Sequence, residues 1–451
     1  SFWISERIIF LGSLLSFLLF ALLLLYTERN NSALHFRSFL DMLFNSVSVG
    51  TLTGLFRGDS GVFTFGGQVV LLADMIINGL ISSVIAILLI LFMRLGFDRK
   101  ESLKTELEKM GLFSRNTLLF ILFDFLFIWM VGIILLMFSH ATNLWEAIFN
   151  SASHILNDGI TALPNNMVPF RENASILLSG SFLITIGGLS IGIRGIAYKA
   201  VLKLIGLKKL AGAIPNSVLA PKNFVIVVLV VTVALQVFGM LTMYGFEGSN
   251  AKIFPAGTSE SVKILDTYYM SVSARTAGFT VFPDLSLLQD KSSYVLMFLM
   301  MIGAASSSFA GGVLKLTAFI YIFFYIISSL RGHKQVTSPH KHIRLSERTQ
   351  IEANFRIIGF SIALFVIVLL LFIVQPDISG SFLIFESISA VSNTGLSLGA
   401  TNALNDWGMV LIIILMTIGK LGFITTVISF FPQYQQLIEQ ARTEYDEFPV
   451  D

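Results

Sequence analysis

The sequence predicts an all-α polytopic membrane protein with eight spanning helices, built from four repeats of helix, re-entrant loop and helix. Three observations predict this fold class. Of the 451 residues, 55% are hydrophobic and only 13% are charged, whereas soluble proteins carry roughly 25% charged residues. Long apolar runs recur along the chain, and a short motif recurs between them. A soluble monomer of this composition would expose large apolar patches, so we expect lipid to be the solvent.

Eight apolar segments account for the spanning helices. Each is long enough to cross a hydrocarbon core of roughly 30 Å. The segments are Ile8–Tyr26, Val69–Met93, Thr117–Phe138, Ile176–Val201, Phe224–Tyr244, Tyr294–Leu330, Ile357–Val374 and Met409–Phe431. The first segment is too long for the apolar part of a cleavable signal peptide, so we expect it to be retained as a membrane helix.

A motif of about a dozen residues, too short to span, lies between the two members of each pair of apolar segments. It contains an aromatic residue, then Ser-x-Ser, and then Gly followed by a large apolar residue. The four copies are FNSVSVGTLTGL (Phe44–Leu55), FNSASHILNDGI (Phe149–Ile160), YMSVSARTAGF (Tyr269–Phe279) and FESISAVSNTGL (Phe385–Leu396). Their glycines are separated by 105, 119 and 117 residues, which is typical of an internal repeat. We expect four re-entrant hairpins.

The distribution of Lys and Arg predicts the orientation in the membrane. The three linkers between repeats hold six basic residues each, whereas the re-entrant sides together hold seven outside the four motif copies. We therefore expect the linkers and both termini to be cytoplasmic and all four hairpins to enter from outside the cell membrane. The expected domains are repeats one to four over residues 1–98, 99–208, 209–335 and 336–432, and a cytoplasmic tail over residues 433–451.

Composition and motifs exclude several function classes. A net charge of +2 provides no field that would recruit nucleic acid. Because the chain has no cysteine, disulfides, Cys-ligated zinc and iron–sulfur clusters are excluded. Its six His residues form no helical metal pair, and the H-E-x-x-H motif is absent, so we expect no enzymatic activity.

The hairpins predict a pseudo-fourfold pore for a monovalent cation. Non-helical backbone at membrane depth is tolerated where it lines water, and loop carbonyls can replace the hydration shell of such an ion. Gly permits the positive φ that turns these carbonyls toward one point, and the short helices before each turn direct the negative ends of their dipoles at the ion. The expected filter residues are Thr53, Gly54, Asp158, Gly159, Ala277, Gly278, Thr394 and Gly395, flanked by Thr51, Leu52, Asn157, Thr276 and Asn393.

Asp158 is the exception among filter side chains that are mainly hydroxyl or amide groups. Neutral oxygen ligands favour a monovalent over a divalent ion, because divalent cations prefer several carboxylates. The sequence leaves two roles open for Asp158: it raises the local cation concentration, or it only caps the loop.

Three filter segments resemble those of a known family. L-T-G-L at Leu52–Leu55, A-R-T-A-G-F at Ala274–Phe279 and S-N-T-G-L-S at Ser392–Ser397 resemble motifs of the Trk/Ktr/HKT superfamily of potassium transporters, especially the bacterial Ktr and Trk membrane subunits. The resemblance covers nearly the whole chain. It implies potassium uptake, with K⁺ at the filter carbonyls, and Gly54 favours potassium because plant relatives with Ser there prefer sodium. N-D-G-I at Asn157–Ile160 departs from the family's N-A-G-F, which bears on ion affinity more than on architecture.

Two further sites match the family and imply a gate. A run of small residues interrupts the sixth span where the family has an intramembrane gating loop; a close-packing helix face is the alternative. A lysine within the last apolar segment is costly without a partner or a pore, and relatives carry Arg there, so we expect either a pore gate or an ion pair. The gate residues are Gly303, Ala304, Ala305, Ser306, Ser307, Ser308, Gly311, Gly312 and Lys420.

Other charges in the apolar segments have several possible roles. We expect Arg194 to snorkel to the interface, and Arg275 either to tether the end of the third short helix or to tune ion affinity. Asp124 either touches a coupling ion or pairs with Lys420, Lys315 or Arg194.

The resemblance also implies partners. It implies a homodimer on a cytoplasmic nucleotide-binding regulatory ring of the RCK type, in contact with membrane lipids. The chain shows neither a dinucleotide fingerprint nor a Walker loop, so we expect no organic cofactor on it. A sodium-coupled or sodium-selective transporter of the same fold remains an alternative. An organic-solute carrier is less favoured, because carriers usually repeat twice and break their spanning helices.

Overall fold

The computed structural model describes residues 2–95, 115–140, 142–215, 219, 222–304, 308 and 347–421. All regular secondary structure in these ranges is helical. The long helices are α1 (Phe2–Glu28), α3 (Phe65–Leu95), α5 (Arg115–Phe138), α7 (Ala174–Gly188), α10 (Lys222–Glu247), α12 (Asp290–Ile302), α14 (Glu347–Val374) and α17 (Asp406–Leu421). Shorter elements connect or follow them: α8 (Ile191–Leu204), α9 (Lys208–Ala213), α16 (Ala400–Ala403), η1 (Ser60–Val62), η2 (Val168–Phe170) and η4 (Leu285–Leu287).

Four short helices carry the recurring motif. They are α2 (Phe39–Gly50), α6 (Leu144–Leu156), α11 (Glu260–Ser273) and α15 (Gly380–Val391). In each, the leading aromatic residue of the motif is completely buried; these residues are Phe44, Phe149, Tyr269 and Phe385. Capping boxes begin α2 at Ser38 and α6 at Asn143, because each side chain accepts from a backbone N–H three residues on. The motif therefore anchors one short helix in each repeat.

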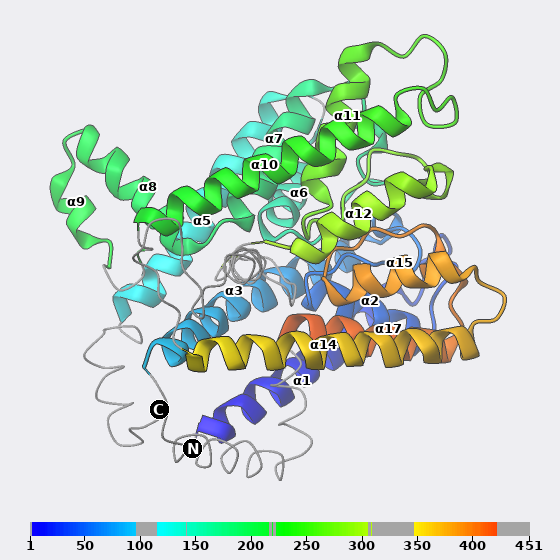
Figure 1. The fold of residues 1–451 in the computed structure, drawn as a ribbon, viewed down its shortest axis with the longest axis horizontal. Coiled ribbons are helices and arrows are strands. Elements are labelled where there is room, and N and C mark those ends of the chain that lie inside the picture. The colour runs from blue at the N-terminus through cyan, green and yellow to red at the C-terminus, as the bar shows by residue number, and fades with distance from the viewer. Residues whose placement is uncertain are drawn as a thin grey trace, which may run out of the picture.

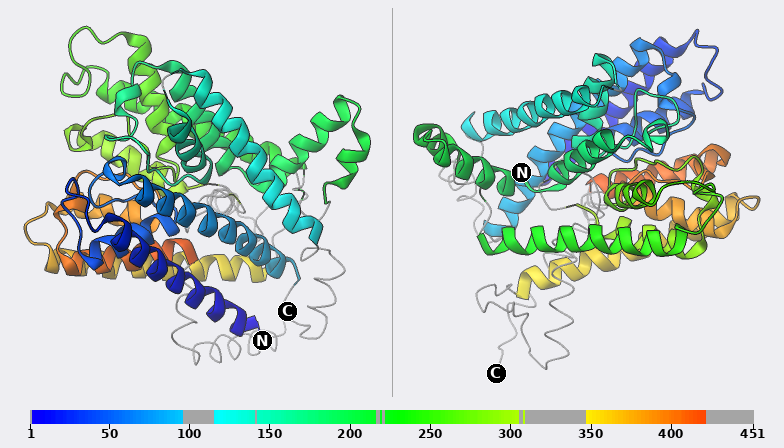
Figure 2. Two further views of the ribbon diagram at one scale, coloured as in Figure 1. Left: turned by 180° about the vertical axis from the view of Figure 1, so that it is seen from behind. Right: turned by 90° about the horizontal axis from the view of Figure 1, so that it is seen from above.

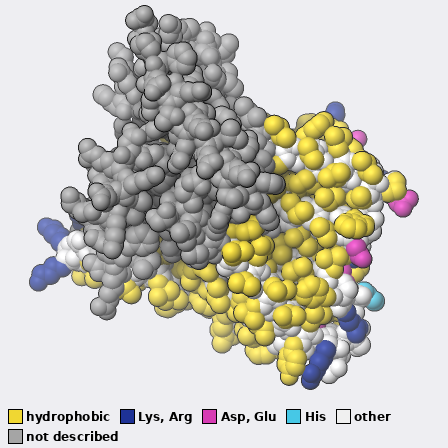
Figure 3. Space-filling model, turned by 90° about the horizontal axis from the view of Figure 1, so that it is seen from below, with side chains coloured by type: hydrophobic (Ala, Val, Ile, Leu, Met, Phe, Trp, Pro, Cys, Tyr) yellow, Lys and Arg dark blue, Asp and Glu magenta, His cyan; other side chains and the backbone are white. Residues whose placement is uncertain are grey.

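Three helical segments in the described ranges are long and apolar enough to cross a membrane: Phe10–Glu28, Leu119–Phe138 and Val225–Glu247. They overlap the first, third and fifth predicted spans, and the first and last of them extend two or three residues further. Their outward faces stay apolar and exposed, as at Leu15 (66%) and Met130 (62%). Figure 3 shows hydrophobic side chains over much of the face outside its grey region. Such a surface suits contact with lipid.

The predicted span Ile176–Val201 is wrong as one continuous helix. α7 ends at Gly188 and α8 begins at Ile191, and the two helices are bent by 109°. Ser190 is extended, and its side chain accepts a hydrogen bond from the Ile193 N–H, which is the geometry of a helix N-cap. A new helix therefore starts in another direction, although the apolar run continues.

The sixth predicted span is described only at its beginning. α12 ends at Ile302, and Gly303 has a φ of 57° and a ψ of −166°, a backbone conformation that is accessible to glycine and ends the helix. Among the predicted gate residues, Ala305, Ser306, Ser307, Gly311 and Gly312 lie outside the described residues.

The repeats pack in cyclic order. Each short helix packs against the first long helix of its own repeat, and it also packs against the last long helix of the preceding repeat. The second type of contact joins α3 to α6, α7 to α11, α12 to α15 and α17 to α2. Because α17 and α2 lie near opposite ends of the sequence, the ring closes. Figures 1 and 2 show the blue N-terminal helices beside the yellow-to-red C-terminal ones.

Candidate functional site

Four loops, which we number 1 to 4, follow α2, α6, α11 and α15. Each contains a motif glycine with positive φ: Gly54 (85°), Gly159 (83°), Gly278 (72°) and Gly395 (97°). The residue two positions before each glycine is also left-handed: Leu52 (57°), Asn157 (57°), Thr276 (68°) and Asn393 (50°). Non-glycine residues rarely adopt this conformation, so its recurrence shows that the four loops share one backbone path.

The loops contact one another in a ring. A Cβ atom at each motif glycine would overlap a carbonyl oxygen of the neighbouring loop. The glycine and carbonyl pairs are Gly54 with Asp158, Gly159 with Ala277, Gly278 with Thr394 and Gly395 with Thr53. The last pair joins loop 4 to loop 1, so the ring is closed. Both the positive φ and the lack of space require glycine at these positions.

The backbone N–H groups of the loops point back toward the short helices. Each donates to the carbonyl of the second serine of the motif. These bonds run from Thr53 to Ser48 (2.8 Å), from Asp158 to Ser153 (3.0 Å), from Ala277 to Ser273 (2.9 Å) and from Thr394 to Ser389 (2.9 Å). These four N–H groups are used on the helix side, whereas the carbonyl oxygens of the same four residues lie where the loops meet. Such a set of carbonyls can replace the hydration shell of a monovalent cation.

Polar side chains in three of the four short helices hold the segment after the motif glycine. The Asn45 amide accepts from the Arg57 N–H (2.8 Å), and the Asn150 amide accepts from the Ala162 N–H (3.0 Å). Glu386, at the equivalent position of α15, accepts from the Ser397 hydroxyl at 2.7 Å. These residues were not predicted from the sequence. The signal was present, because the position before the first serine is polar in three of the four motif copies.

Arg57, which follows loop 1, joins the first and fourth repeats. Its Nε lies 3.1 Å from Asp41 Oδ1. Its Nη1 donates to the carbonyls of Thr401 (2.8 Å) and Leu404 (3.0 Å), and its guanidinium lies over the Phe36 ring at 4.3 Å. Charge-assisted hydrogen bonds of this kind are stronger than neutral ones. The guanidinium therefore stabilises the contact at which the ring closes.

The second and third short helices are joined through a histidine. His154 Nδ1 lies 2.6 Å from the Asn150 carbonyl, which can only accept, so this nitrogen carries the proton. Its Nε2 therefore accepts from the Tyr269 hydroxyl at 2.9 Å. The imidazole stacks on Phe279 with 4.0 Å between ring centroids. The buried histidine has partners on both nitrogens, so it holds two repeats together.

The prediction that Arg194 snorkels is wrong. Its side chain is buried and lies 2.7 Å from Asp124 Oδ2, so one of the pairings expected for Asp124 is confirmed. Arg194 also donates to the Ile186 and Leu189 carbonyls at the end of α7, and the Tyr198 hydroxyl donates to Asp124 at 2.7 Å. The arginine stays buried because it pairs with a carboxylate and donates to carbonyl groups at the end of α7, which have no helical partners beyond the bend.

Arg275 tethers loop 3. Its Nη2 donates to the Gly303 carbonyl at 3.2 Å, and its Nη1 lies 3.5 Å from the Thr232 carbonyl. These contacts join the end of α11 to α10 and to the first residue of the small-residue run. Of the two roles expected for Arg275, they account for tethering.

Three charged side chains lie close together beside loops 1 and 2. Asp74 is buried and accepts from the Ser46 hydroxyl (3.0 Å) and the Asn78 amide (2.7 Å). Lys420, in the last turn of α17, interacts electrostatically with Asp74 and Asp158. The Asp158 side chain is completely buried, and both of its carboxylate oxygens lack a hydrogen-bond donor in the described part of the chain.

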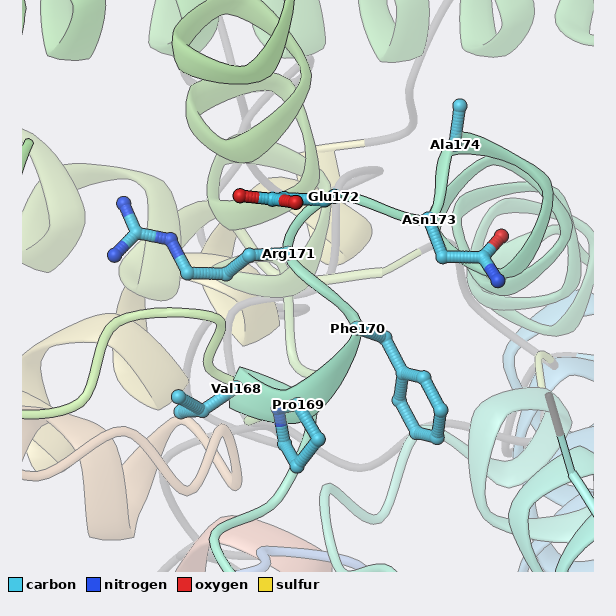
Figure 4. A pocket seen from close by; sticks show the side chains of 7 residues that line it. All are labelled: Val168, Pro169, Phe170, Arg171, Glu172, Asn173 and Ala174. Atoms are coloured by element: carbon cyan, nitrogen blue, oxygen red, sulfur yellow. The ribbon is translucent and has the colours of Figure 1, made fainter. Parts of the chain in front are cut away.

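A separate recess of about 700 Å³ lies along residues Val168 to Ala174. Figure 4 shows that the side chains lining it point in different directions rather than toward one point. Arg171, its one basic residue, is paired with Asp266 at 2.7 Å. Within the described ranges, no group of three or more His, Cys, Asp or Glu residues could hold a metal ion. The ring of loops is therefore the better candidate for a functional site.

Comparison with known proteins identifies similar chains along nearly the whole length. The chain is 28% identical to the Ktr system potassium uptake protein B of Bacillus subtilis (strain 168), over 94% of this chain and 92% of that protein. It is 27% identical to the potassium/sodium uptake protein NtpJ of Enterococcus hirae, over 94% of this chain and 90% of that protein.

A solved structure and a family model agree with this likeness. The potassium transporter TrkH from Vibrio parahaemolyticus has a similar fold, with a TM-score of 0.70 and 16% identity over 94% of this chain and 85% of that one. The TrkH family model, described as a cation transport protein, matches residues 97–437. The chain is thus a multi-pass, all-helical membrane protein of a transporter family rather than an enzyme. It belongs to the TrkH cation transport protein family.

Proposed function

We propose that this chain is the ion-translocating membrane subunit of a potassium uptake system and that loops 1 to 4 form its selectivity filter. The closed ring of four positive-φ glycines carries the proposal, because in it a carbonyl oxygen of each loop lies beside the glycine of the neighbouring loop. The names of the relatives from Bacillus subtilis and Enterococcus hirae support potassium as the substrate.

The proposed filter uses the backbone more than the side chains. Its residues are Thr53, Gly54, Asp158, Gly159, Ala277, Gly278, Thr394 and Gly395. α2, α6, α11 and α15 end three to five residues before their glycines, so the negative ends of their dipoles lie near the ion. Cations are favoured over anions for this reason. The flanking residues Thr51, Leu52, Asn157, Thr276 and Asn393 shape the loops.

The four repeats of the proposed pore cover residues 1–98, 99–208, 209–335 and 336–432. The cyclic packing of each short helix against the preceding repeat supports this division. We place the termini and the linkers in the cytoplasm, because the linkers hold most of the Lys and Arg residues. The loops then enter from the outer side of the cell membrane.

Gating is proposed to involve Lys420 and the run from Gly303 to Gly312. The Lys420 ammonium lies in the field of Asp74 and Asp158, so its charge acts close to loop 2. Arg275 connects loop 3 with Gly303, so a movement at the start of the run would reach the filter. A positive charge on the ion path opposes cation flow in the resting state.

Regulation is proposed to come from other chains. The Bacillus subtilis relative is named as part of a Ktr system, and this chain has no nucleotide-binding fingerprint of its own. We therefore propose a homodimer that docks on a cytoplasmic nucleotide-binding ring. The basic linkers are suited to that contact.

Flux through the purified protein in liposomes tests the proposed function. Potassium and sodium uptake are compared in vesicles without any organic solute, and protein-free vesicles are the control. We expect saturable potassium uptake that exceeds sodium uptake. Because the Enterococcus hirae relative is named for both ions, sodium uptake equal to or above potassium uptake would favour the sodium alternative. Absence of both fluxes would contradict the proposal.

A further inference from the structure

We propose that the Asp158 carboxylate is itself a ligand of a monovalent cation at loop 2, in addition to the backbone carbonyls. This inference rests on the proposed function, because it adds a side-chain ligand to the same filter. It assigns to loop 2 a chemistry that the other three loops lack.

The equivalent positions in the ring show what is different about loop 2. Thr53, Ala277 and Thr394 stand where loop 2 has Asp158. The two threonine hydroxyls have partners: Thr53 Oγ1 lies 2.7 Å from Thr51 Oγ1, and Thr394 Oγ1 lies 2.7 Å from Ser392 Oγ. Asp158 is therefore the one acidic side chain at this position of the ring, and none of the described residues donates a hydrogen bond to its carboxylate.

The carboxylate is built into the protein interior without a donor. The residue is 0% exposed, and neither carboxylate oxygen accepts a hydrogen bond from the described residues. A buried charge without hydrogen bonds or a counter-charge in contact is strongly destabilising. A bound cation would supply the missing contact. The Asp158 backbone is already at the ring, because its carbonyl oxygen occupies the space beside Gly54.

The surrounding charges favour a single positive charge. Asp74, the other nearby carboxylate, is already satisfied by Ser46 and Asn78, so it does not offer a second open ligand. Divalent cations prefer several carboxylates, and no such group exists in the described ranges. One open carboxylate beside neutral carbonyl oxygens suits K⁺ or Na⁺.

The position of Lys420 gives this site a second consequence. Its ammonium interacts electrostatically with the Asp158 carboxylate, which is also the proposed ligand of the ion. An ion at Asp158 would repel the lysine, and an empty site would attract it. Ion occupancy at loop 2 and the position of the proposed gate charge are then coupled.

Thermal unfolding of the full-length protein in detergent tests the site. Unfolding is followed in KCl, NaCl or choline chloride at constant ionic strength, since a ligand that binds only the folded protein raises Tm in a saturable way. We expect K⁺, Na⁺ or both to raise Tm above choline, and the KCl and NaCl series distinguish the two ions. In Asp158→Thr we expect the half-saturating concentration to rise at least about tenfold, with a similar rise in KM for potassium flux.

The choice of variants keeps the test decisive. Thr is the residue that the chain already has at this position in loops 1 and 4, and Asp158→Asn preserves the shape if Asp158→Thr fails to fold. Asp74→Asn is the matched control, because it removes a nearby buried charge that already has partners. A change in Asp74→Asn as large as that in Asp158→Thr would show a remote field effect and overturn the assignment as a ligand.

Other outcomes separate this inference from the proposed function. Unchanged half-saturation in Asp158→Thr and Asp158→Asn, with potassium flux intact, would overturn the side-chain ligand and leave the filter standing. Saturable stabilisation that depends on Asp158, without potassium flux in the wild type, would overturn the proposed function and support the site. If the Asp158-dependent change in Tm follows pH and is the same in KCl, NaCl and choline chloride, the carboxylate binds a proton rather than a metal cation, and the inference is wrong.

Discussion

Gly54 shows how little space a filter residue has. Its φ is 85°, and a side chain would meet the Asp158 carbonyl oxygen. We expect Gly54→Ser to displace loops 1 and 2 and to lower the potassium-to-sodium flux ratio by about tenfold, which corresponds to 1.4 kcal/mol. Liposome flux measures the ratio. Gly245→Ser is the control because nothing lies within 4 Å of a Cβ there; an unchanged ratio in Gly54→Ser would remove this glycine from the filter.

Arg194 is a residue whose removal leaves a charge behind. In Arg194→Leu the Asp124 carboxylate remains buried without its cation, so we expect the free energy of unfolding to fall by about 3–5 kcal/mol. Asp124→Leu combined with Arg194→Leu removes both charges and should recover part of this loss. Thermal unfolding in detergent measures both variants. An equal loss in the single and double variants would show that the ion pair is not what the arginine contributes.

Lys420 is expected to oppose cation flow. Because its ammonium lies in the field of the carboxylates beside loops 1 and 2, Lys420→Ala should raise basal potassium flux in liposomes that contain no cytoplasmic partner. Lys263→Ala, which removes a lysine paired with Glu260 on the surface, is the control. Normal flux together with collapsed expression would instead assign Lys420 a structural role.

At the scale of elements, each short helix positions its loop from both sides. Asn150 on α6 accepts the Ala162 N–H after the glycine of loop 2. Asn150→Ala leaves this buried donor without a partner, so we expect the free energy of unfolding to fall by about 1–3 kcal/mol. The potassium-to-sodium flux ratio should fall with it. Asn143→Ala removes the N-cap at the exposed start of the same helix, so it is the control for the flux ratio, which it should leave unchanged. An unchanged flux ratio in Asn150→Ala would show that this amide does not shape the filter.

The elements were predictable where the signal was local. The four short segments followed from the repeated motif, because each copy encodes its own helix and turn. The bend at Ser190 was not predicted, since hydropathy does not distinguish a serine that caps a helix from one inside it. The pairing of Arg194 was left open because its partner Asp124 lies 70 residues earlier in the chain. The roles of Asn150 and Glu386 were not predicted, because a repeated motif shows that a position recurs but not which way its side chain points.

At the scale of the whole molecule, the ring is complete within one chain, so assembly is not needed to build it. We expect the purified protein to run as a dimer in mild detergent and to bind ATP or ADP only when a cytoplasmic partner is added. Light scattering and nucleotide-binding assays measure the two properties. Nucleotide binding by the isolated chain, or a stable monomer with full regulated flux, would contradict the proposed assembly.

Because all four loops belong to one chain, each loop of the filter can change independently of the others. In a ring of four identical subunits, every substitution enters four times, so a carboxylate would bring three like charges with it. Here Asp158 enters once, and Thr53, Ala277 and Thr394 hold the equivalent positions of the other loops. A single-chain ring can therefore acquire a charge, lose a hydroxyl or change a turn in one loop while the other three loops stay the same. Its affinity for an ion can drift gradually, without passing through forms whose own charges repel one another.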